Sequence, residues 1–146
     1  MEVKPSDKSK LPNVSAEIVL SYMKKFVQAS DLHKLTRGVH SSVLLDLEGN
    51  EIVFVDEIGR HNAVDKIIGY AAKNSISLGD KMIFSTGRLS SEILYKTIYS
   101  GAKVIVSKAA PTSLSVELAR ENNIILIANV RSNRFDVLNG YENIVV

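Results

Sequence analysis

Four short segments of the chain combine small polar residues with at least one cation, and each follows an apolar, strand-like run. The segments span residues 59–62, 85–88, 107–112 and 131–134, and the first three lead into helical patterns. In an α/β sheet, the loops that leave the carboxyl ends of parallel strands share one edge, and ligands bind there. Such a group of cations predicts a site for a phosphorylated, polyanionic ligand. The cations are Arg60, Arg88, Lys108, Arg131 and Arg134.

The segments have three properties that suit phosphate. Helix N-termini present unpaired backbone N–H groups and the positive end of the helix dipole, which attract anions. Small residues let a phosphate approach the backbone, and arginine offers a planar fork that matches phosphate oxygens. Residues 85–88 combine all three properties before a predicted helix. Lys108 adds a point charge before the next helix, and Arg131 and Arg134 flank a polar turn.

Each of these residues also has a purely structural interpretation. Gly87 suits a turn, and Arg88 or Lys108 taken alone is an ordinary surface cation. Ser90 and Thr112 suit helix N-caps, and Glu92 can stabilise the start of its own helix. The prediction of a ligand site therefore depends on the repetition of a cationic polar segment at successive strand ends.

His61 lies at a predicted helix start, where the helix dipole disfavours its charged form. Arg60 precedes it and Asp65 follows four residues later. A general acid/base role and a structural hydrogen bond are both open interpretations. A metal shared by His61 and Asp65 lacks a third ligand, and no histidine pair has HExxH or HxH spacing. We therefore predict no bound metal.

Composition excludes several classes of function. The 146 residues suit one domain, and their 45% apolar and 23% charged content is ordinary for a globular protein. No apolar run reaches the roughly 18 residues of a membrane helix, and the first ten residues do not resemble a secretory signal. We therefore expect a cytoplasmic protein without membrane contact. The net charge of +2 argues against bulk nucleic-acid binding. The chain has no cysteine, which excludes disulfides and cysteine nucleophiles within it.

The first half of the chain is predicted to be a tail, a helix and a hairpin. Residues 1–14, with three lysines and two prolines, are predicted to form a flexible tail before a single domain over residues 15–146. Apolar residues recur at helical spacing over residues 15–27. Two apolar runs at residues 39–46 and 51–56 are separated by a glycine–asparagine turn signal, which predicts an antiparallel hairpin.

Beyond the hairpin, predicted helices and strands alternate, with Asn62 as the N-cap of the first helix. The apolar runs of the later strands are continuous, which is typical of strands covered by helices on both faces. The β-α-β order then requires right-handed crossovers and parallel strands. The sequence predicts a three-layer α/β sandwich with a mixed sheet. The predicted helices span 90–99 and 112–121, and the predicted strands span 82–84, 103–106 and 124–127.

Longer motifs resemble one known family. Residues 55–69 resemble the EDVGRHNAxDKxxG signature of the formate dehydrogenase accessory sulfurtransferases, the FdhD family. Residues 85–92 resemble its SGRxSxE stretch, and residues 107–119 resemble SxxAPTxLAVELA. Residues 131–137 resemble its RxxRxNVY ending, and residues 36–40 resemble TGGxH. The resemblance extends from about residue 15 to the C-terminus.

The resemblance implies a cytidine-deaminase-like fold and a role in sulfur transfer. Members of the family carry sulfur from a cysteine desulfurase to the molybdenum cofactor of formate dehydrogenase, as a persulfide on a CGxCG-type motif. They also bind the molybdopterin guanine dinucleotide cofactor, here expected in its Mo-bis form, and their C-terminal arginine loop is implicated. For this chain the resemblance implies formate dehydrogenase and a cysteine desulfurase as partners and a guanine nucleotide as ligand, and it is compatible with a homodimer.

The chain also departs from the family pattern. The cysteine motif lies upstream of the TGGxH region, and this chain has no cysteine. Whether it is a C-terminal fragment or a shortened member, the polypeptide cannot carry a persulfide. Arg37 replaces a family glycine. Ala128, Asn129 and Leu138 stand where the family usually has Gly, Phe and Tyr, so the aromatic groups for ligand stacking are missing there.

Three functions from different classes follow. The first is a cofactor-binding module, in which arginines hold phosphates and His61, Asn62 and Glu92 orient the pterin or guanine. The second is a chaperone-like domain that docks formate dehydrogenase or a desulfurase without a ligand. The third, a hydrolytic deaminase, needs a thiolate-bearing zinc site that a cysteine-free chain lacks. No catalytic residue is assigned. The predicted cofactor-binding residues are Gly59, Arg60, His61, Asn62, Ser85, Gly87, Arg88, Glu92, Arg131, Ser132, Asn133, Arg134, Phe135 and Asp136.

Overall fold

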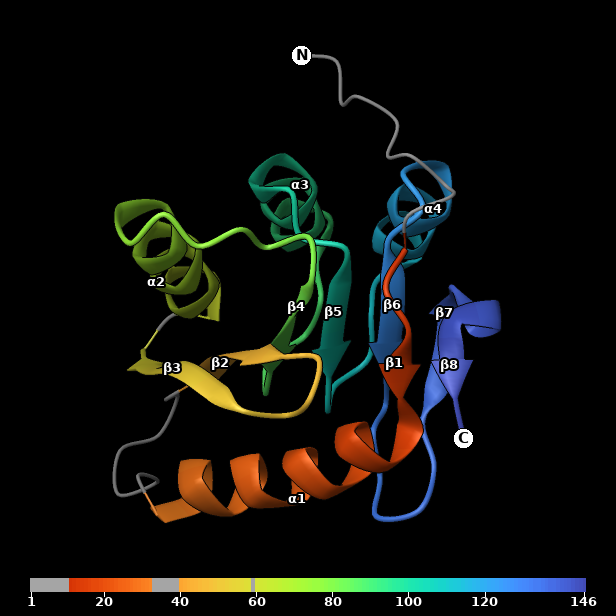
Figure 1. The fold of residues 1–146 in the computed structure, drawn as a ribbon, viewed down its shortest axis with the longest axis horizontal. Coiled ribbons are helices and arrows are strands. Elements are labelled where there is room, and N and C mark those ends of the chain that lie inside the picture. Colours follow the sequence, from red (N-terminus) through yellow and green to blue (C-terminus); the bar gives the residue numbers. More distant parts are fainter. Residues whose placement is uncertain (1–10, 33–39, 59) are drawn as a thin grey trace.

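The computed structural model describes residues 11–32, 40–58 and 60–146 (Figure 1). Its helices are α1 (Ala16–Leu32), α2 (Arg60–Lys73), α3 (Ser91–Ser100) and α4 (Ser113–Glu121), with a short 3-10 helix η2 (Tyr141–Asn143). Its strands are β1 (Val14–Ser15), β2 (His40–Asp46), β3 (Glu51–Glu57), β4 (Lys81–Ser85), β5 (Val104–Ser107), β6 (Ile125–Ala128), β7 (Asp136–Asn139) and β8 (Ile144–Val145).

The main sheet has six strands in the order β3-β2-β4-β5-β6-β7. Strands β4, β5 and β6 are parallel, whereas β2 is antiparallel to both β3 and β4, and β7 is antiparallel to β6. The sheet is therefore mixed, with an antiparallel hairpin followed by parallel strands, as predicted. Because β3, β4, β5 and β6 all run in the same direction, their carboxyl ends lie on one edge, which we call the strand-end edge.

Helices cover both faces of this sheet, with α1 on one side and α2, α3 and α4 on the other (Figure 1). Successive strand residues enter opposite cores because side chains alternate along a strand. In β5, Ile105 packs beneath α2–α4, whereas Val104 and Val106 pack against α1. All three are fully buried. The predicted three-layer sandwich is therefore confirmed. The apolar runs of the later strands are continuous because helices cover both faces of the sheet, as predicted.

Two of the helices that start at the strand-end edge, α3 and α4, are capped by hydroxyl side chains. The Ser90 Oγ accepts a hydrogen bond from the Ile93 backbone N–H at 3.3 Å, before α3. The Thr112 Oγ1 accepts from the Ser115 N–H at 3.2 Å, before α4. Both caps agree with the prediction. They fix the first turns of α3 and α4 at the edge where β4 and β5 end.

The predicted start of α2 is wrong. The helix begins at Arg60, so Asn62 is its third residue and does not cap it. Only Ile58 and Gly59 separate the end of β3 from the helix. The chain therefore turns into helix without the loop that we predicted for residues 59–62. Gly59 lies outside the described residues, and only the backbone of Arg60 and His61 is described.

The two ends of the described chain are hydrogen-bonded to each other. Val14 is fully buried, and β1 pairs in parallel with β8 through Val14 and Ile144. The Asn143 side-chain Nδ2 donates to the Leu11 carbonyl oxygen at 3.2 Å. Residues 11–14, which we assigned to the tail, therefore pack on the domain, because the last strand offers them hydrogen bonds and apolar contacts.

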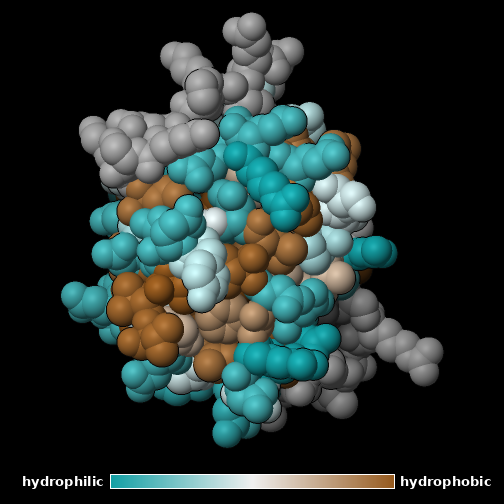
Figure 2. Space-filling model, turned by 90° about the vertical axis from the view of Figure 1, so that its right-hand side faces the viewer, coloured by the Kyte–Doolittle hydropathy of each residue, from teal (hydrophilic) through white to brown (hydrophobic). Residues whose placement is uncertain are grey.

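The side of the molecule that carries β7 and β8 exposes apolar surface between polar patches (Figure 2). Strand β7 is an edge strand, and the exposed Val145 and Val146 end the chain. Within the described residues, no helix is long and apolar enough to cross a membrane.

Candidate functional site

The four cationic segments follow β3, β4, β5 and β6, and the topology places all of them at the strand-end edge. Four strand spacings separate β3 from β6, which is about 19 Å. This span is too long for a single phosphate and suits an extended ligand. The prediction that these segments share one edge is confirmed for the three that the structure describes in full, which follow β4, β5 and β6.

The segments after β4 and β5 are tied together by two buried serines. The Ser107 Oγ donates to the Gly87 carbonyl oxygen at 2.7 Å and accepts from the Ala109 N–H at 2.9 Å. The Ser85 Oγ accepts from the Gly87 N–H at 3.0 Å. The Lys108 N–H donates to the Ser85 carbonyl at 3.2 Å. These bonds hold both segments in one conformation, so the cations they carry start from fixed backbones.

Gly87 has a different role from the one we predicted. It is buried, and both its N–H and its carbonyl are used by Ser85 and Ser107. Its backbone is therefore not available to a phosphate. The neighbouring Arg88 is exposed, and within the described chain its side chain makes no hydrogen bond or ion pair. The cation of this segment is thus the group that can reach a ligand.

The segment after β6 forms a tight turn that is hydrogen-bonded to the segment after β5. The Arg131 N–H donates to the Arg134 carbonyl at 2.8 Å. The Arg131 Nη1 donates to the carbonyl oxygens of Lys108 at 3.1 Å and Val130 at 3.2 Å. Ser132, Asn133 and Arg134 at the tip are exposed. The structure therefore joins the predicted C-terminal site residues to Lys108.

Two predicted site residues at the end of this turn have structural contacts. The Asp136 Oδ2 accepts from the Asn129 Nδ2 at 2.8 Å. Asn129 has a positive φ of 54°, a conformation that asparagine tolerates better than most residues. Phe135 is half-buried and packs on the core beneath α1. These contacts shape the turn, and the exposed residues between them remain the candidates for ligand contact.

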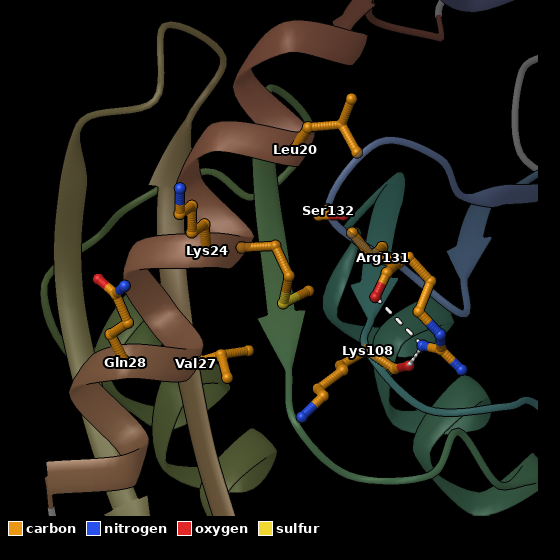
Figure 3. Close-up of a pocket in the computed structure, with 9 residues that line it drawn as sticks. Leu20, Lys24, Val27, Gln28, Lys108, Arg131 and Ser132 are labelled. Carbon is orange, nitrogen blue, oxygen red and sulfur yellow. Dashed lines mark hydrogen bonds between the residues drawn. The ribbon is translucent and has the colours of Figure 1, made fainter.

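A cavity of about 300 Å³ opens between α1 and the segments after β5 and β6 (Figure 3). We call it the α1 pocket. Its lining includes two predicted residues, Arg131 and Ser132, and also Lys108. The prediction missed its α1 side, although the spacing of Leu20, Lys24, Val27 and Gln28 marks one flank of that helix. The full lining is Leu20, Met23, Lys24, Val27, Gln28, Lys108, Val130, Arg131 and Ser132.

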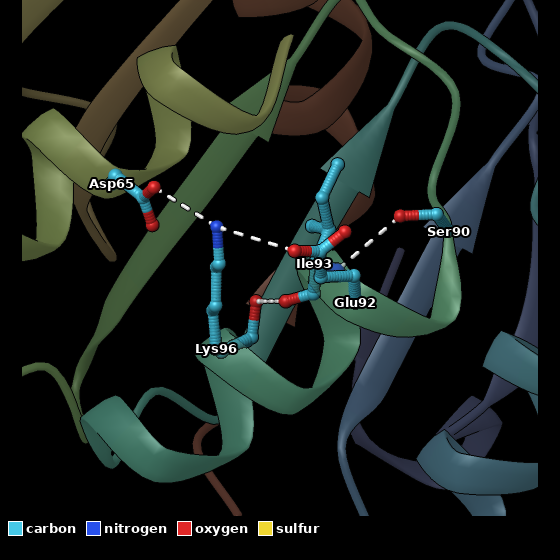
Figure 4. A network of polar contacts seen from close by, with 6 residues as sticks. Asp65, Ser90, Glu92, Ile93 and Lys96 are labelled. Atoms are coloured by element: carbon cyan, nitrogen blue, oxygen red, sulfur yellow. Dashed lines mark hydrogen bonds and ion pairs between the residues drawn. The ribbon is translucent and has the colours of Figure 1, made fainter.

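Glu92 lies on the opposite face of the sheet. It borders a wider groove of about 710 Å³ between α2 and α3, which we call the α2–α3 groove. The Lys96 Nζ lies 2.9 Å from the Asp65 Oδ2 and 4.0 Å from the Glu92 Oε1 (Figure 4). Tyr95 and Tyr99 complete an open wall. The predicted residues therefore divide between two cavities rather than forming one pocket.

The β2–β3 side of the strand-end edge is fixed by polar contacts. The Ser41 Oγ donates to the Asp56 carboxylate. The Ser41 N–H donates to the Thr86 Oγ1 at 3.0 Å, and the Thr86 N–H donates to the Ser41 carbonyl at 3.1 Å. The hairpin is thereby locked to the segment after β4. Asn62 is exposed nearby in α2, whereas the roles predicted for the Arg60 and His61 side chains fall outside the described residues.

At the end of β3, Lys66 forms a hydrogen-bonded ion pair with Glu57. This hydrogen bond and the lysine charge hold the pKa of the Glu57 carboxyl below its usual range. Beyond that pair, the described residues contain no group of three or more His, Asp or Glu side chains placed to hold a metal ion.

Three comparisons relate the chain to known proteins. The model of the FdhD/NarQ family matches residues 1–145. The sulfur carrier protein FdhD of Bacillus subtilis is 41% identical over 131 residues, which is 90% of this chain and 50% of that protein. A solved structure from Desulfotalea psychrophila, described as a formate dehydrogenase accessory protein, superposes with a TM-score of 0.85. It is 30% identical, and the match covers 99% of this chain and 60% of that one.

A more distant comparison concerns the fold alone. The guanine deaminase of Nitrosomonas europaea superposes with a TM-score of 0.55 at 11% identity, over 90% of this chain and 81% of that one. The expectation of a cytidine-deaminase-like fold agrees with this likeness. The chain spans about half the length of the curated relatives that it matches.

Proposed function

Because the chain belongs to the FdhD/NarQ family, we propose that it is the cofactor-binding part of a formate dehydrogenase accessory protein of the sulfur-carrier type. Its ligand is the molybdopterin guanine dinucleotide cofactor in the Mo-bis form. Formate dehydrogenase and a cysteine desulfurase are its partners, and the cytoplasm is its compartment. The observation that carries the proposal is the convergence of four cationic segments on one sheet edge.

The residues at this edge suit such a ligand. Arg88 and Arg134 are exposed and make no hydrogen bond or ion pair through their side chains in the described chain, so both guanidinium groups are available to phosphate oxygens. The edge spans about 19 Å, which accommodates an extended, multiply phosphorylated molecule better than a single nucleotide. The donor set is cationic and hydroxylic, as phosphate binding requires.

The chain itself would bind and orient the cofactor while the sulfur atom is delivered from elsewhere. The cofactor supplies the metal centre that receives sulfur. With no cysteine in its sequence, this polypeptide does not form a persulfide. Its own contribution is to hold the phosphates with arginine and lysine side chains on segments that Ser85 and Ser107 keep rigid. Such preorganisation lowers the entropic cost of binding.

A second candidate is a docking domain without a ligand, which the α2–α3 groove favours. Tyr95 and Tyr99 are 42% and 46% exposed there, and tyrosine is enriched in protein interfaces. In this alternative the groove contacts formate dehydrogenase or the desulfurase directly, and the cations of the strand-end edge serve solubility or steering only.

Calorimetric titration of the chain with GDP, with ADP as a comparison, tests the proposal. We expect GDP to bind and the Arg88→Ala/Arg134→Ala variant to lose about a hundredfold in affinity, because two charge-assisted contacts to phosphate disappear. Arg120→Ala is the control for loss of an exposed arginine, since Arg120 lies in the last turn of α4, at the opposite edge of the sheet. No GDP binding by the folded protein, together with co-purification of formate dehydrogenase that the double variant leaves intact, would favour the docking alternative.

A further inference from the structure

The α1 pocket combines an apolar interior with a cationic rim. We propose that it is the subsite for the ring-bearing, phosphorylated end of the ligand, with Lys24 as an additional phosphate-binding cation. This inference rests on the proposed function and assigns roles to α1, which none of the cationic segments includes.

The pocket is apolar inside and cationic at its rim. Four of its lining side chains are apolar and offer a surface for a planar ring; they are Leu20, Met23, Val27 and Val130. Three others are cations, and none is a carboxylate. The cations come from separate parts of the fold, with Lys24 on α1 and Lys108 and Arg131 on the segments after β5 and β6 (Figure 3). This combination selects a flat, partly apolar molecule that carries negative charge.

Arg131 is oriented for this task by its own contacts. Its Nη1 donates to the carbonyl oxygens of Lys108 and Val130, at 3.1 and 3.2 Å. Within the described chain no carboxylate is paired with it. The remaining N–H groups of the guanidinium can therefore bind an anion without first breaking an ion pair.

The α1 wall of the pocket is held in place. The Phe26 ring meets the rings of Phe54 and Phe84 edge-on, with centroid distances of 5.7 and 6.4 Å. The Tyr22 hydroxyl donates to the Glu51 Oε1 at 2.6 Å. Burial and the Glu51 carboxylate raise the pKa of Tyr22, so the hydroxyl stays a donor. A wall anchored to two strands of the sheet makes the pocket preformed, which favours binding.

The volume of the α1 pocket limits the size of the chemical group that it can hold. A volume of about 300 Å³ lies at the lower end of small-molecule sites. It suits one ring system with its nearest phosphate and not a whole dinucleotide. The remainder of an extended ligand then lies along the strand-end edge towards Arg88. The α1 pocket thus sets the direction in which the ligand is bound.

Charge reversal at adjacent α1 residues tests the phosphate role of Lys24. Lys24→Glu and Lys25→Glu change the net charge equally, and both lysines are exposed, but only Lys24 lines the pocket. By calorimetry we expect Lys24→Glu to weaken GDP binding by about tenfold or more and Lys25→Glu to change it by less than about twofold. Equal affinities of the two variants would overturn the inference.

A second pair of variants tests the ring role of the pocket. Leu20→Ala removes part of its apolar wall, whereas Ile18→Ala removes an equivalent α1 side chain that packs on the same core outside the pocket. We expect Leu20→Ala to weaken GDP about fivefold and to leave inorganic pyrophosphate, which has no ring, unchanged. If Leu20→Ala and Ile18→Ala bind GDP alike, the ring does not lie in this pocket.

The outcomes separate this inference from the function on which it rests. GDP binding that is lost in Arg88→Ala/Arg134→Ala but kept in Lys24→Glu and Leu20→Ala would sustain the proposed function and overturn the α1 subsite. Failure of the wild-type chain to bind either GDP or pyrophosphate while it remains folded would overturn both.

Discussion

The strand-end edge has a cavity on each face of the sheet, and the two cavities differ in how their charges are balanced. In the α1 pocket, Lys24, Lys108 and Arg131 surround an apolar interior with no carboxylate in the lining. In the α2–α3 groove, Lys96 lies between Asp65 and Glu92. A cation that is already paired attracts a further anion weakly, so of these two cavities the α1 pocket is the better suited to phosphate.

Among single substitutions, the largest effect that we predict concerns the rigidity of the two cavities. Ser107 and Ser100 each donate one hydrogen bond and accept one, but Ser107 is fully buried at the strand-end edge, whereas Ser100 lines the open groove. We expect Ser107→Ala to lower the free energy of unfolding by about 2 kcal/mol, because the Gly87 carbonyl and the Ala109 N–H lose a partner.

Ser100→Ala should cost about 1 kcal/mol or less, since water can replace the hydroxyl there. Urea denaturation of both variants measures the difference. Equal losses of unfolding free energy would show that the hydrogen bonds of Ser107, which link the β4 and β5 segments, stabilise the fold no more than those of Ser100.

The next effect concerns ligand affinity and compares one lysine from each cavity. Lys108→Ala removes a cation from the α1 pocket, and Lys96→Ala removes the paired cation of the α2–α3 groove. We expect GDP affinity to fall about tenfold in the first variant and to change less than about twofold in the second. A stronger effect of Lys96→Ala would reverse the roles that we assign to the two cavities.

The smallest effect is a pH dependence on the α2 side. Lys66 lowers the pKa of Glu57, so the pair stabilises the fold above the ordinary carboxyl pKa. That stabilisation is lost as the pH falls through the lowered pKa of the folded state. We expect Lys66→Met to have a lower urea midpoint than the wild type at neutral pH and the same midpoint in strong acid. A difference that persists in strong acid would show that Lys66 acts through packing rather than charge.

Much of the architecture was predictable because it depends on local patterns. The continuous apolar runs of β5 and β6 predicted buried parallel strands, and hydroxyl residues before α3 and α4 predicted their caps. The start of α2 was not predictable from its capping signal. Asn62 is a good N-cap residue by type, but the chain enters the helix at Arg60 after a two-residue connection.

The candidate site was only half predictable, for a geometric reason. Sequence order indicates that a segment follows a strand, but it does not indicate which face of the sheet its side chains approach. Arg131 and Glu92 therefore belonged to one predicted site and lie at different cavities. The position of Lys24 in the lining of the α1 pocket was missed because it depends on how α1 crosses the sheet, which the contacts of Phe26 with two strands determine.

The most direct test of the account is a map of GDP-induced amide shifts by nuclear magnetic resonance on the ¹⁵N-labelled chain. We predict shifts at Lys24, Arg88, Lys108 and Ser132 and none at Tyr95 or Tyr99, since the ligand occupies the strand-end edge and the α1 pocket. Shifts confined to the α2–α3 groove, or no shifts at ligand concentrations in the millimolar range, would contradict the claim that this domain binds a phosphorylated cofactor at its cationic edge.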